Sequence, residues 1–292
     1  MSSTHTASIV IPAHNEASVI GRLLDGILAG TDPDEFLIVV SCNGCTDGTV
    51  ALARARGVHV VETARASKIA ALNAGDRKAG DVFPRLYIDA DVVISTDDVR
   101  KVVRALSVDA HVAAAPKLHV VTAGRPAIVR GFYHVLVRLP WVTNGLLGSG
   151  FYGVSRVGRQ SFIEFPEIIN DDEFVRGLFS DSERISVKDA TFRIEAPMST
   201  RSLIRAKARV VAGTGEMIQR NRDEKIARGE STRIPRGGSL PFLRLMADPR
   251  NWIPILAYAT VRVGARVYRR TEVMRKGQVG WEQDTTTRAL TR

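Results

Sequence analysis

The chain has 292 residues, of which 45% are hydrophobic and 25% charged. This composition is typical of a globular protein and excludes fibrous, collagen-like and largely disordered chains. The length allows one large domain or two small ones, and two cysteines exclude a disulfide-built scaffold. A strand-like apolar segment begins by residue 8 with no Lys or Arg before it, which leaves no room for a signal peptide, so we expect a cytoplasmic protein.

The net charge of +10 is concentrated in the last third of the chain. Residues 193–292 hold 21 Lys and Arg against 9 Asp and Glu, whereas residues 1–192 are slightly acidic. Such a basic segment suits a nucleic acid, a diphosphate or an anionic membrane surface. No nucleic-acid-binding motif accompanies it, so nucleic acid is not an expected partner.

Apolar runs and helical patterns alternate over the first 115 residues. The strand-like runs are 9–11, 36–40, 58–61, 86–88 and 111–115, and the helical patterns are 17–28, 48–56, 69–73 and 97–106. This alternation predicts an α/β fold, a mostly parallel sheet with helices on both faces. Ligands of such sheets bind beyond the carboxyl ends of the strands.

The rest of the chain is predicted to hold further elements of both kinds. We expect helices at 126–139, 172–179 and 200–219, a strand at 150–154, and a hairpin formed by 185–187 with 192–194. Residues 223–240 are charged and poor in apolar residues, which predicts a mobile basic loop. Residues 241–292 are expected to form a C-terminal amphipathic helix and tail.

Two acidic clusters follow predicted elements. Asp89 and Asp91 come directly after the apolar run 86–88, and hard oxygen ligands at that spacing suit Mg²⁺ or Mn²⁺. A helix-capping pair at a surface turn is the alternative. The second cluster, NDDEFV at 170–175, could supply a general base for an attacking hydroxyl, or it could be an acidic helix N-terminus favoured by the helix dipole.

Four sequence blocks together resemble the family 2 glycosyltransferases. They are SIVIPAHNE at 8–16, NGCTDGT at 43–49, KIAALNAG at 68–75 and YIDAD at 87–91. The resemblance covers about residues 7–215 and implies a GT-A fold over 1–222. Within it, residues 1–115 would form the nucleotide-binding part and residues 116–222 the acceptor-binding part.

The resemblance also implies roles for individual residues. The nucleotide sugar would be bound by Pro12, Ala13, Asn15, Glu16, Asn43, Lys68, Asn73, Asp89 and Ala90. Asp89 and Asp91 would hold the metal ion, Mn²⁺ or Mg²⁺, with Asp91 as the direct ligand. Asp172 takes the position of the catalytic base, which implies inversion at the anomeric carbon. The acceptor side would include Gly148, Ser149, Gly150 and Asp171. The leaving diphosphate needs cations, and the candidates are Arg201, Arg205, Lys207 and Arg209.

Two departures from the family pattern affect specificity. Cys42 and Asn43 stand where the family usually has two Asp residues. An Asn amide can both accept and donate, so the base preference is loosened, with UDP the first expectation and GDP or dTDP the alternatives. The family's Gln-x-x-Arg-Trp segment is replaced by Ala206, Arg209 and Val210 at the matching positions, which favours single-sugar addition over processive synthesis.

We therefore expect a metal-dependent inverting glycosyltransferase. It would transfer a sugar from a nucleotide-diphosphate sugar to a hydroxyl acceptor, a sugar or lipid-linked glycan, during glycan, glycolipid or cell-envelope polysaccharide synthesis. The alternative is a noncatalytic nucleotide-sugar-binding protein or membrane-associated scaffold. The uncharged run 251–261 is too short to span a bilayer, and two interpretations stay open: a helix on the cytoplasmic face of an anionic membrane, or a helix packed on the domain.

Overall fold

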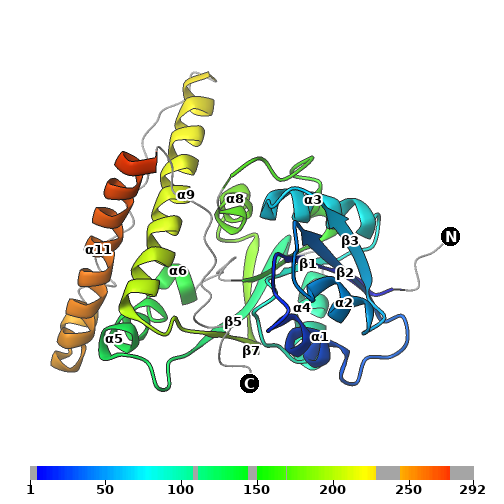
Figure 1. Ribbon diagram of the computed structural model, residues 1–292, viewed down its shortest axis with the longest axis horizontal. Helices are drawn as coiled ribbons and strands as arrows, with labels where there is room; N and C mark the ends of the chain where they lie inside the picture. The colour runs from blue at the N-terminus through cyan, green and yellow to red at the C-terminus, as the bar shows by residue number, and fades with distance from the viewer. Residues whose placement is uncertain (1–4, 108–110, 144–149, 169, 228–243, 277–292) are drawn as a thin grey trace.

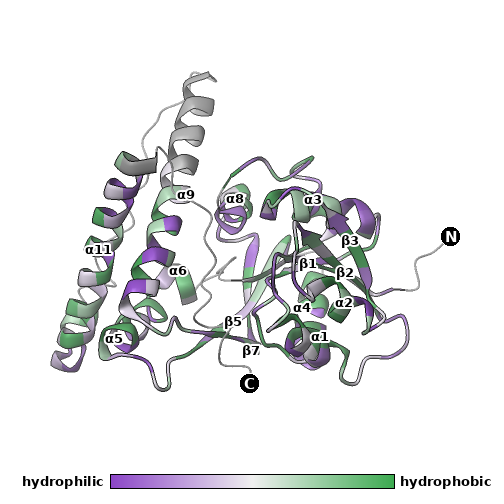
Figure 2. Cartoon of the chain, in the orientation of Figure 1, coloured by the Kyte–Doolittle hydropathy of each residue, from purple (hydrophilic) through white to green (hydrophobic). Residues whose placement is uncertain are grey.

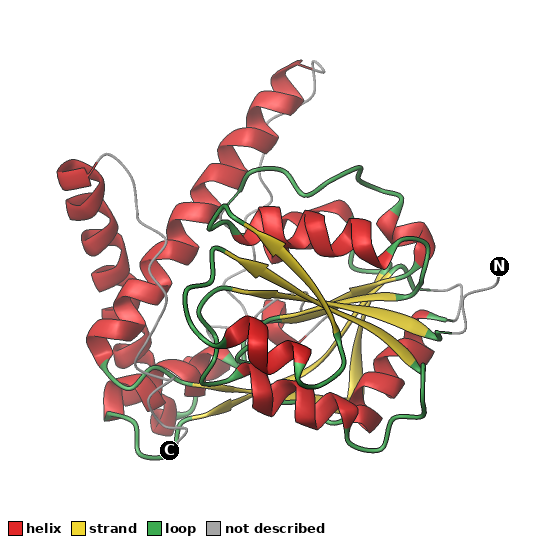
Figure 3. Ribbon diagram, turned by 45° about the vertical axis from the view of Figure 1, so that its right-hand side comes forward, coloured by secondary structure: helices red, strands yellow, loops and turns green. Residues whose placement is uncertain are grey.

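The structure is a computed structural model that describes residues 5–107, 111–143, 150–168, 170–227 and 244–276. A seven-stranded sheet with the order β3-β2-β1-β4-β6-β5-β7 forms its centre. Helices cover both faces of this sheet (Figure 3). The predicted α/β class, with a mostly parallel sheet, is confirmed.

The first half of the chain forms the parallel part of the sheet. Its strands are β1 (Ala7–Ala13), β2 (Phe36–Asn43), β3 (His59–Thr63) and β4 (Arg85–Ile88). Its helices are α1 (Ile20–Leu28), α2 (Thr49–Arg54), α3 (Lys68–Ala79) and α4 (Thr96–Leu106). The pairs β1–β2, β1–β4 and β2–β3 are all parallel, so their carboxyl ends meet at one edge.

Side-chain alternation along the strands builds two cores. Ile9 and Ile11 of β1 belong to the cluster shared with α1 and α4, whereas Val10 faces the cluster shared with α3. Successive strand residues point to opposite faces, and both faces are covered here, so the strand is apolar apart from the buried Ser8. Figure 1 shows α3 on one side of the sheet and α1, α2 and α4 on the other.

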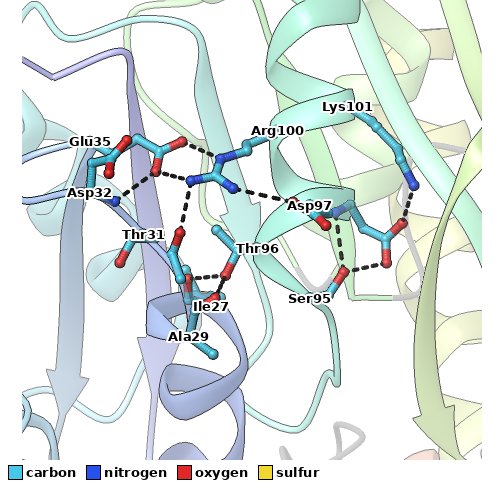
Figure 4. Close-up of polar contacts among 12 residues, drawn as sticks. Ile27, Ala29, Thr31, Asp32, Glu35, Ser95, Thr96, Asp97, Arg100 and Lys101 are labelled. Carbon is cyan, nitrogen blue, oxygen red and sulfur yellow. Dashed lines mark hydrogen bonds and ion pairs between the residues drawn. The ribbon is translucent and has the colours of Figure 1, made fainter.

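The α4 N-terminus is fastened to α1 and to the turn before β2 (Figure 4). Ser95 caps the helix, and the Thr96 hydroxyl donates to the Ile27 carbonyl at 2.8 Å. Arg100 Nε contacts Glu35 Oε1 at 2.7 Å. These contacts fix the position of the α4 N-terminus and so of the connection from β4 to α4, which begins with Asp89.

The second half adds β5 (Ala113–Val121), β6 (Phe151–Val154) and β7 (Arg184–Glu195) to the sheet. Strand β6 is antiparallel to both β4 and β5, and β7 is parallel to β5. The hairpin predicted for 185–187 and 192–194 is therefore wrong. Val187 pairs with Pro116 and Thr191 with Lys117, so residues 188–190 form an irregularity inside one long strand. Pairing along β5 overrides the local turn signal.

The remaining helices are α5 (Ala127–Leu136), α6 (Pro140–Thr143), α7 (Arg156–Arg159), α8 (Asp171–Leu178), α9 (Thr200–Ala227), the 3₁₀ turn η1 (Pro249–Asn251) and α11 (Trp252–Lys276). Because α9 continues to Ala227, the first part of the predicted loop 223–240 is helical. No Gly or Pro interrupts residues 216–227, so nothing ends the helix there. The rest of that segment lies outside the described residues.

Helices α5, α9 and α11 pack together beside the β5–β7 end of the sheet, where α9 and α11 lie side by side (Figure 1). Their shared core includes Phe132, Leu203 and Val261. The rings of Phe132 and Tyr258 are stacked with centroids 5.1 Å apart. One face of the C-terminal helix is thus packed on the domain.

Candidate active site

The loops after β1 and β2 are joined at the carboxyl edge of the sheet. Asn15 has a φ of 52°, which Asn tolerates better than most residues, and its Oδ1 accepts hydrogen bonds from Thr46. The backbone N–H of Glu16 donates to the Thr49 hydroxyl at 2.8 Å. Asn15 thus braces the loop after β2 with the side chain that was expected to contact the nucleotide.

Three predicted donor-site residues at the end of β1 and beside it are buried. Pro12 and Ala13 end β1, and Glu16 is 6% exposed. Their contact with a nucleotide stays a prediction.

Asn43 ends β2 with its side chain in a fixed orientation. Its Nδ2 donates to the Ala13 carbonyl at 2.9 Å. The residue is 1% exposed, and its Oδ1 has no hydrogen-bond partner among the described residues. One N–H of the amide is therefore used inside the protein, and the unpartnered Oδ1 is buried. Contact between Asn43 and a base stays a prediction.

Lys68 joins two carboxylates from different elements. It begins α3, and its Nζ lies 2.8 Å from Asp89 Oδ1 and 2.9 Å from Asp171 Oδ1. Asp89 follows β4, and Asp171 begins α8. Burial acts to lower the Lys68 pKa, but the charges of Asp171 and Asp89 outweigh it and raise that pKa, so the ammonium stays charged. Residues far apart in the sequence are thus brought together as predicted.

Asp171 is held on both of its carboxylate oxygens. Oδ1 contacts Lys68, and Oδ2 accepts a hydrogen bond from the Tyr152 hydroxyl at 3.0 Å. The residue is only 3% exposed. Asp171 is therefore not open to an acceptor, which corrects its expected place on the acceptor side.

Asp172 is less buried than Asp171. It is partly buried, and one of its oxygens accepts a hydrogen bond from the Glu173 N–H at 2.8 Å. Burial and the charge of Asp171 raise the pKa of Asp172 to about 6, against the opposing charge of Lys68. A carboxylate with a pKa close to neutral is suited to accept a proton near neutral pH.

The acidic cluster carries more negative than positive charge. Lys68 is the single cation that contacts Asp89 and Asp171 in the described ion pairs, and Asp172 lies near enough to affect the Lys68 pKa. Asp91, two residues beyond Asp89, is partly buried at the same strand end. This donor set fits a divalent cation, because Mg²⁺ and Mn²⁺ favour oxygen ligands.

The two candidate metal ligands differ in their surroundings. One oxygen of Asp89 is in contact with Lys68. Direct coordination of a metal ion by Asp91 stays a prediction. The described residues contain no group of three or more side chains that could hold a metal. Mg²⁺ is often held by one or two protein carboxylates together with substrate phosphates. Ala90, between them, is 3% exposed and packs in the core, so only its backbone could contact a nucleotide sugar.

Gly150 allows the backbone before β6 to approach Asp89. Its φ is +104°, and a Cβ there would lie 3.0 Å from Val92 Cγ2 and 3.5 Å from Asp89 Oδ2. The carbonyl of Gly150 accepts a hydrogen bond from the Asp89 N–H at 2.8 Å. Gly150 therefore lies against Asp89, and its expected place on the acceptor side stays a prediction. The other two predicted glycine-loop residues, Gly148 and Ser149, lie outside the described residues.

Asn73 does not match its expected role at the diphosphate. Its Nδ2 donates to the Phe165 carbonyl at 3.0 Å, and its Oδ1 accepts from the Phe165 N–H at 2.9 Å. Both ends of the amide are used in this reciprocal pair. Asn73 therefore holds the segment that leads to α8, because the backbone groups of residue 165 have no strand or helix partner of their own.

The cations of α9 lie on different faces of the helix. Arg201, Arg205 and Arg209 recur every four residues and so share one face, on which Arg201 and Arg205 are exposed. Arg205 lies over the Tyr268 ring of α11. Lys207 lies 5.5 Å from the Phe132 ring centroid, and burial lowers its pKa to about 8 while Asp172 opposes the shift. Lys207 thus lies close enough to Asp172 for the two charges to interact, and diphosphate stabilisation by the three arginines stays a prediction.

Two supporting contacts were missed in the sequence. Tyr152 has no motif that marks it as the hydrogen-bond donor to Asp171. Asn170, just before α8, donates to the Val210 carbonyl of α9 at 3.2 Å. A Cβ at Gly213 would lie 2.5 Å from Asn170 Cγ. The glycine inside a helical pattern was the available signal, because such a glycine is costly unless close packing requires it.

Comparisons with known proteins agree with this geometry. The family model described as Glycosyl transferase family 2 matches residues 8–164, more than half of the chain. The mannosyltransferase PcManGT from Pyrobaculum calidifontis, in complex with GDP-Man and Mn²⁺, has a TM-score of 0.60 and 19% identity, over 98% of this chain and 84% of that chain. Glucosyl-3-phosphoglycerate synthase from Mycobacterium tuberculosis, in complex with Mn²⁺, UDP-Glc and glycerol 3-phosphate, has a TM-score of 0.52 and 22% identity, over 74% of this chain and 80% of that chain.

No curated protein gives a significant match to the chain. The two structures are too distant in sequence to show more than the shared fold. The matched residues 8–164 include β1, the loop after β2, α3 and the end of β4, whereas α8 follows them in the chain. The chain therefore belongs to glycosyl transferase family 2 and is a glycosyltransferase with a GT-A fold.

Proposed function

We propose that the chain is a metal-dependent, inverting glycosyltransferase that uses a nucleotide-diphosphate sugar and a hydroxyl acceptor. The observation that carries the proposal is the position of Asp172, a partly buried carboxylate beside the cluster of Lys68, Asp89 and Asp171, with a pKa raised to about 6. The reaction would add single sugars in glycan, glycolipid or cell-envelope polysaccharide synthesis, and we place it in the cytoplasm, at the surface of an anionic membrane.

The proton transfer is assigned to Asp172. As the acceptor oxygen forms its bond to the anomeric carbon, its proton passes to the Asp172 carboxylate, and the bond to the diphosphate oxygen breaks with its electron pair. Attack on the face opposite to the leaving group inverts the anomeric carbon. Asp171 cannot take this role because both of its oxygens are engaged. A positioned base typically contributes 10²–10⁴-fold.

The leaving group needs positive charge. A Mn²⁺ or Mg²⁺ ion held by Asp91, with Asp89 beside it, would neutralise the charge that develops on the diphosphate. Lys68 keeps Asp89 and Asp171 in place and remains charged. The acceptor oxygen of Asn43 would bind an N–H group of the base. Uracil, thymine and guanine all offer one, so UDP stays the first choice, with dTDP and GDP as the alternatives.

The test compares Asp172→Asn with Asp91→Ala in the full chain. Transfer and slow donor hydrolysis are followed with UDP-sugars and GDP-sugars in the presence of Mn²⁺, and nucleotide binding is measured by calorimetry. We expect Asp172→Asn to lose at least 10²-fold in rate with nearly unchanged binding of the nucleotide diphosphate, and Asp91→Ala to lose the Mn²⁺-dependent part of that binding. Full turnover by Asp172→Asn would end the base assignment. A wild-type protein that binds donors and leaves them whole would support the noncatalytic alternative.

A further inference from the structure

Helix α11 has an outer face that is apolar although its inner face already forms a core. The inner face packs Ala257, Tyr258, Val261 and Ala265 against α5 and α9. On the outer face, large apolar side chains are highly exposed: Trp252 61%, Ile253 82%, Leu256 68%, Val263 57%, Val267 55% and Met274 78%. Surface helices normally expose polar residues on the side away from the core.

The exposed side chains form a stripe from Ile253 to Val267. Positions 253, 256, 260, 263 and 267 follow one another at intervals of three or four residues, so they lie on one face of the helix, with Thr260 as the polar residue among them. Met274 lies further along this face, beyond the exposed Arg270 and Thr271. Figure 2 shows hydrophobic and hydrophilic residues interleaved along α11. Contiguous exposed apolar surface of this kind marks an interaction site.

The charge of the helix indicates which partner fits. Between Trp252 and Lys276 there are six Lys or Arg residues and one acidic residue, Glu272. Arg266 and Arg270 are exposed beside the apolar stripe. In a symmetric dimer through this face, two strongly basic helices would lie against each other, and such like-charge contacts are unfavourable. An anionic surface complements both the arginines and the apolar side chains.

We propose that the outer face of α11 docks the protein on an anionic lipid bilayer, with the helix lying in the plane of the interface. This deepens the proposed placement of the enzyme at a membrane and is independent of the chemistry assigned to Asp172. No helix among the described residues is long and apolar enough to cross a bilayer. Apolar side chains of the stripe enter the acyl boundary, while the arginines contact lipid phosphates.

Co-sedimentation of the full chain with vesicles tests the proposal. Vesicles of phosphatidylglycerol and phosphatidylcholine are compared with pure phosphatidylcholine, at low and high salt. We expect binding to the anionic vesicles that weakens with salt. The double variant Leu256→Ser with Val263→Ser should reduce the partition coefficient at least tenfold, and Arg266→Gln and Arg270→Gln about fivefold each.

Matched variants outside α11 provide the controls. Ile163→Ser replaces an apolar side chain that is 93% exposed, and Arg77→Gln replaces an exposed arginine of α3. Both should bind vesicles like the wild type. Absence of binding to anionic vesicles, or equal binding of the stripe variants, would overturn the proposal. So would a dimer in light scattering that dissociates in the Leu256 and Val263 double variant.

Failure of the docking proposal can be distinguished from failure of the proposed glycosyltransferase reaction. Donor hydrolysis by the wild type and by the stripe variants is measured without vesicles, where membrane docking has no effect. Hydrolysis that is preserved while vesicle binding is lost shows that the variants are folded and that the stripe alone was affected. Loss of the Asp172 assignment would leave the docking surface unchanged.

Discussion

Replacement of Asp172 by Asn should stabilise the folded protein while it abolishes transfer. The carboxylate has an ordinary pKa of 3.8 and a folded-state pKa of about 6, raised chiefly by burial. The folded state therefore holds this proton more tightly than the unfolded chain does. Through this group, the stability of the wild type falls as the pH rises from about 4 to about 6 and is constant above that range.

The size of the effect follows from the two pKa values. A difference from 3.8 to about 6 corresponds to about 3 kcal/mol at 1.36 kcal/mol per pH unit. Asp172 is partly exposed, and solvent screening reduces the expected gain of Asp172→Asn to about 1–2 kcal/mol. The amide of Asn keeps the shape of the side chain and removes the charge that is held beside Asp171.

Urea denaturation of both proteins at pH 8 and at pH 4 measures this gain. The free energy of unfolding of Asp172→Asn should exceed that of the wild type at pH 8, and the difference should nearly vanish at pH 4. Glu164→Gln is the control, because that carboxylate is exposed in a surface ion pair with Arg77 and should show no such difference. Equal differences at the two pH values, or a less stable variant at pH 8, would refute the raised pKa of Asp172.

Two further predictions concern the residues around Asp171. Lys68→Met leaves Asp89 and Asp171 without their cation and should lower stability by about 2–3 kcal/mol, less than for a fully buried pair because Lys68 is 26% exposed. Thermal denaturation should show partial recovery with Mn²⁺ and near-normal stability for Lys68→Arg; an unchanged melting temperature for Lys68→Met would contradict the contact. Tyr152→Phe removes the donor to the buried Asp171 and should cost about 1–3 kcal/mol in urea denaturation, whereas Tyr268→Phe should cost less.

The hydrophobic pattern of the sequence predicted helices and strands correctly where tertiary packing agrees with the local preference of the residues. The alternation of apolar runs with helical spacing located β1 to β4 and α1 to α4, because β1, β2 and β4 are covered on both faces and are therefore mostly apolar. The same reasoning failed at 185–194. There the pairing of β7 with β5 keeps one strand extended through residues 188–190, and no local signal reports a partner strand about 70 residues away.

The sequence also allowed candidate site residues to be identified, but it did not predict which groups their side chains contact. Asp89 and Asp91 could be singled out because they directly follow an apolar strand, where unpaired carboxylates are costly to bury. Asp172 could be singled out because the resemblance to the family places it at the position of the base. Asn73 could not be assigned correctly, since its amide contacts the backbone of Phe165, 92 residues further along the chain. Asn43 was predicted to contact the base. The hydrogen bond from its Nδ2 to the Ala13 carbonyl could not be predicted, because it depends on how β1 and β2 lie side by side.

The sequence by itself determined the family and the α/β class, and it predicted which acidic residues hold a metal or accept a proton, because these inferences depend on residue type and on spacing along the chain. The tertiary structure decided which carboxylate is available. It placed Asp171 between Lys68 and Tyr152 and left Asp172 partly exposed, since three separate elements meet there. It also showed that α11 packs through one face and exposes an apolar stripe on the other, because only the positions of α5 and α9 define which side is covered.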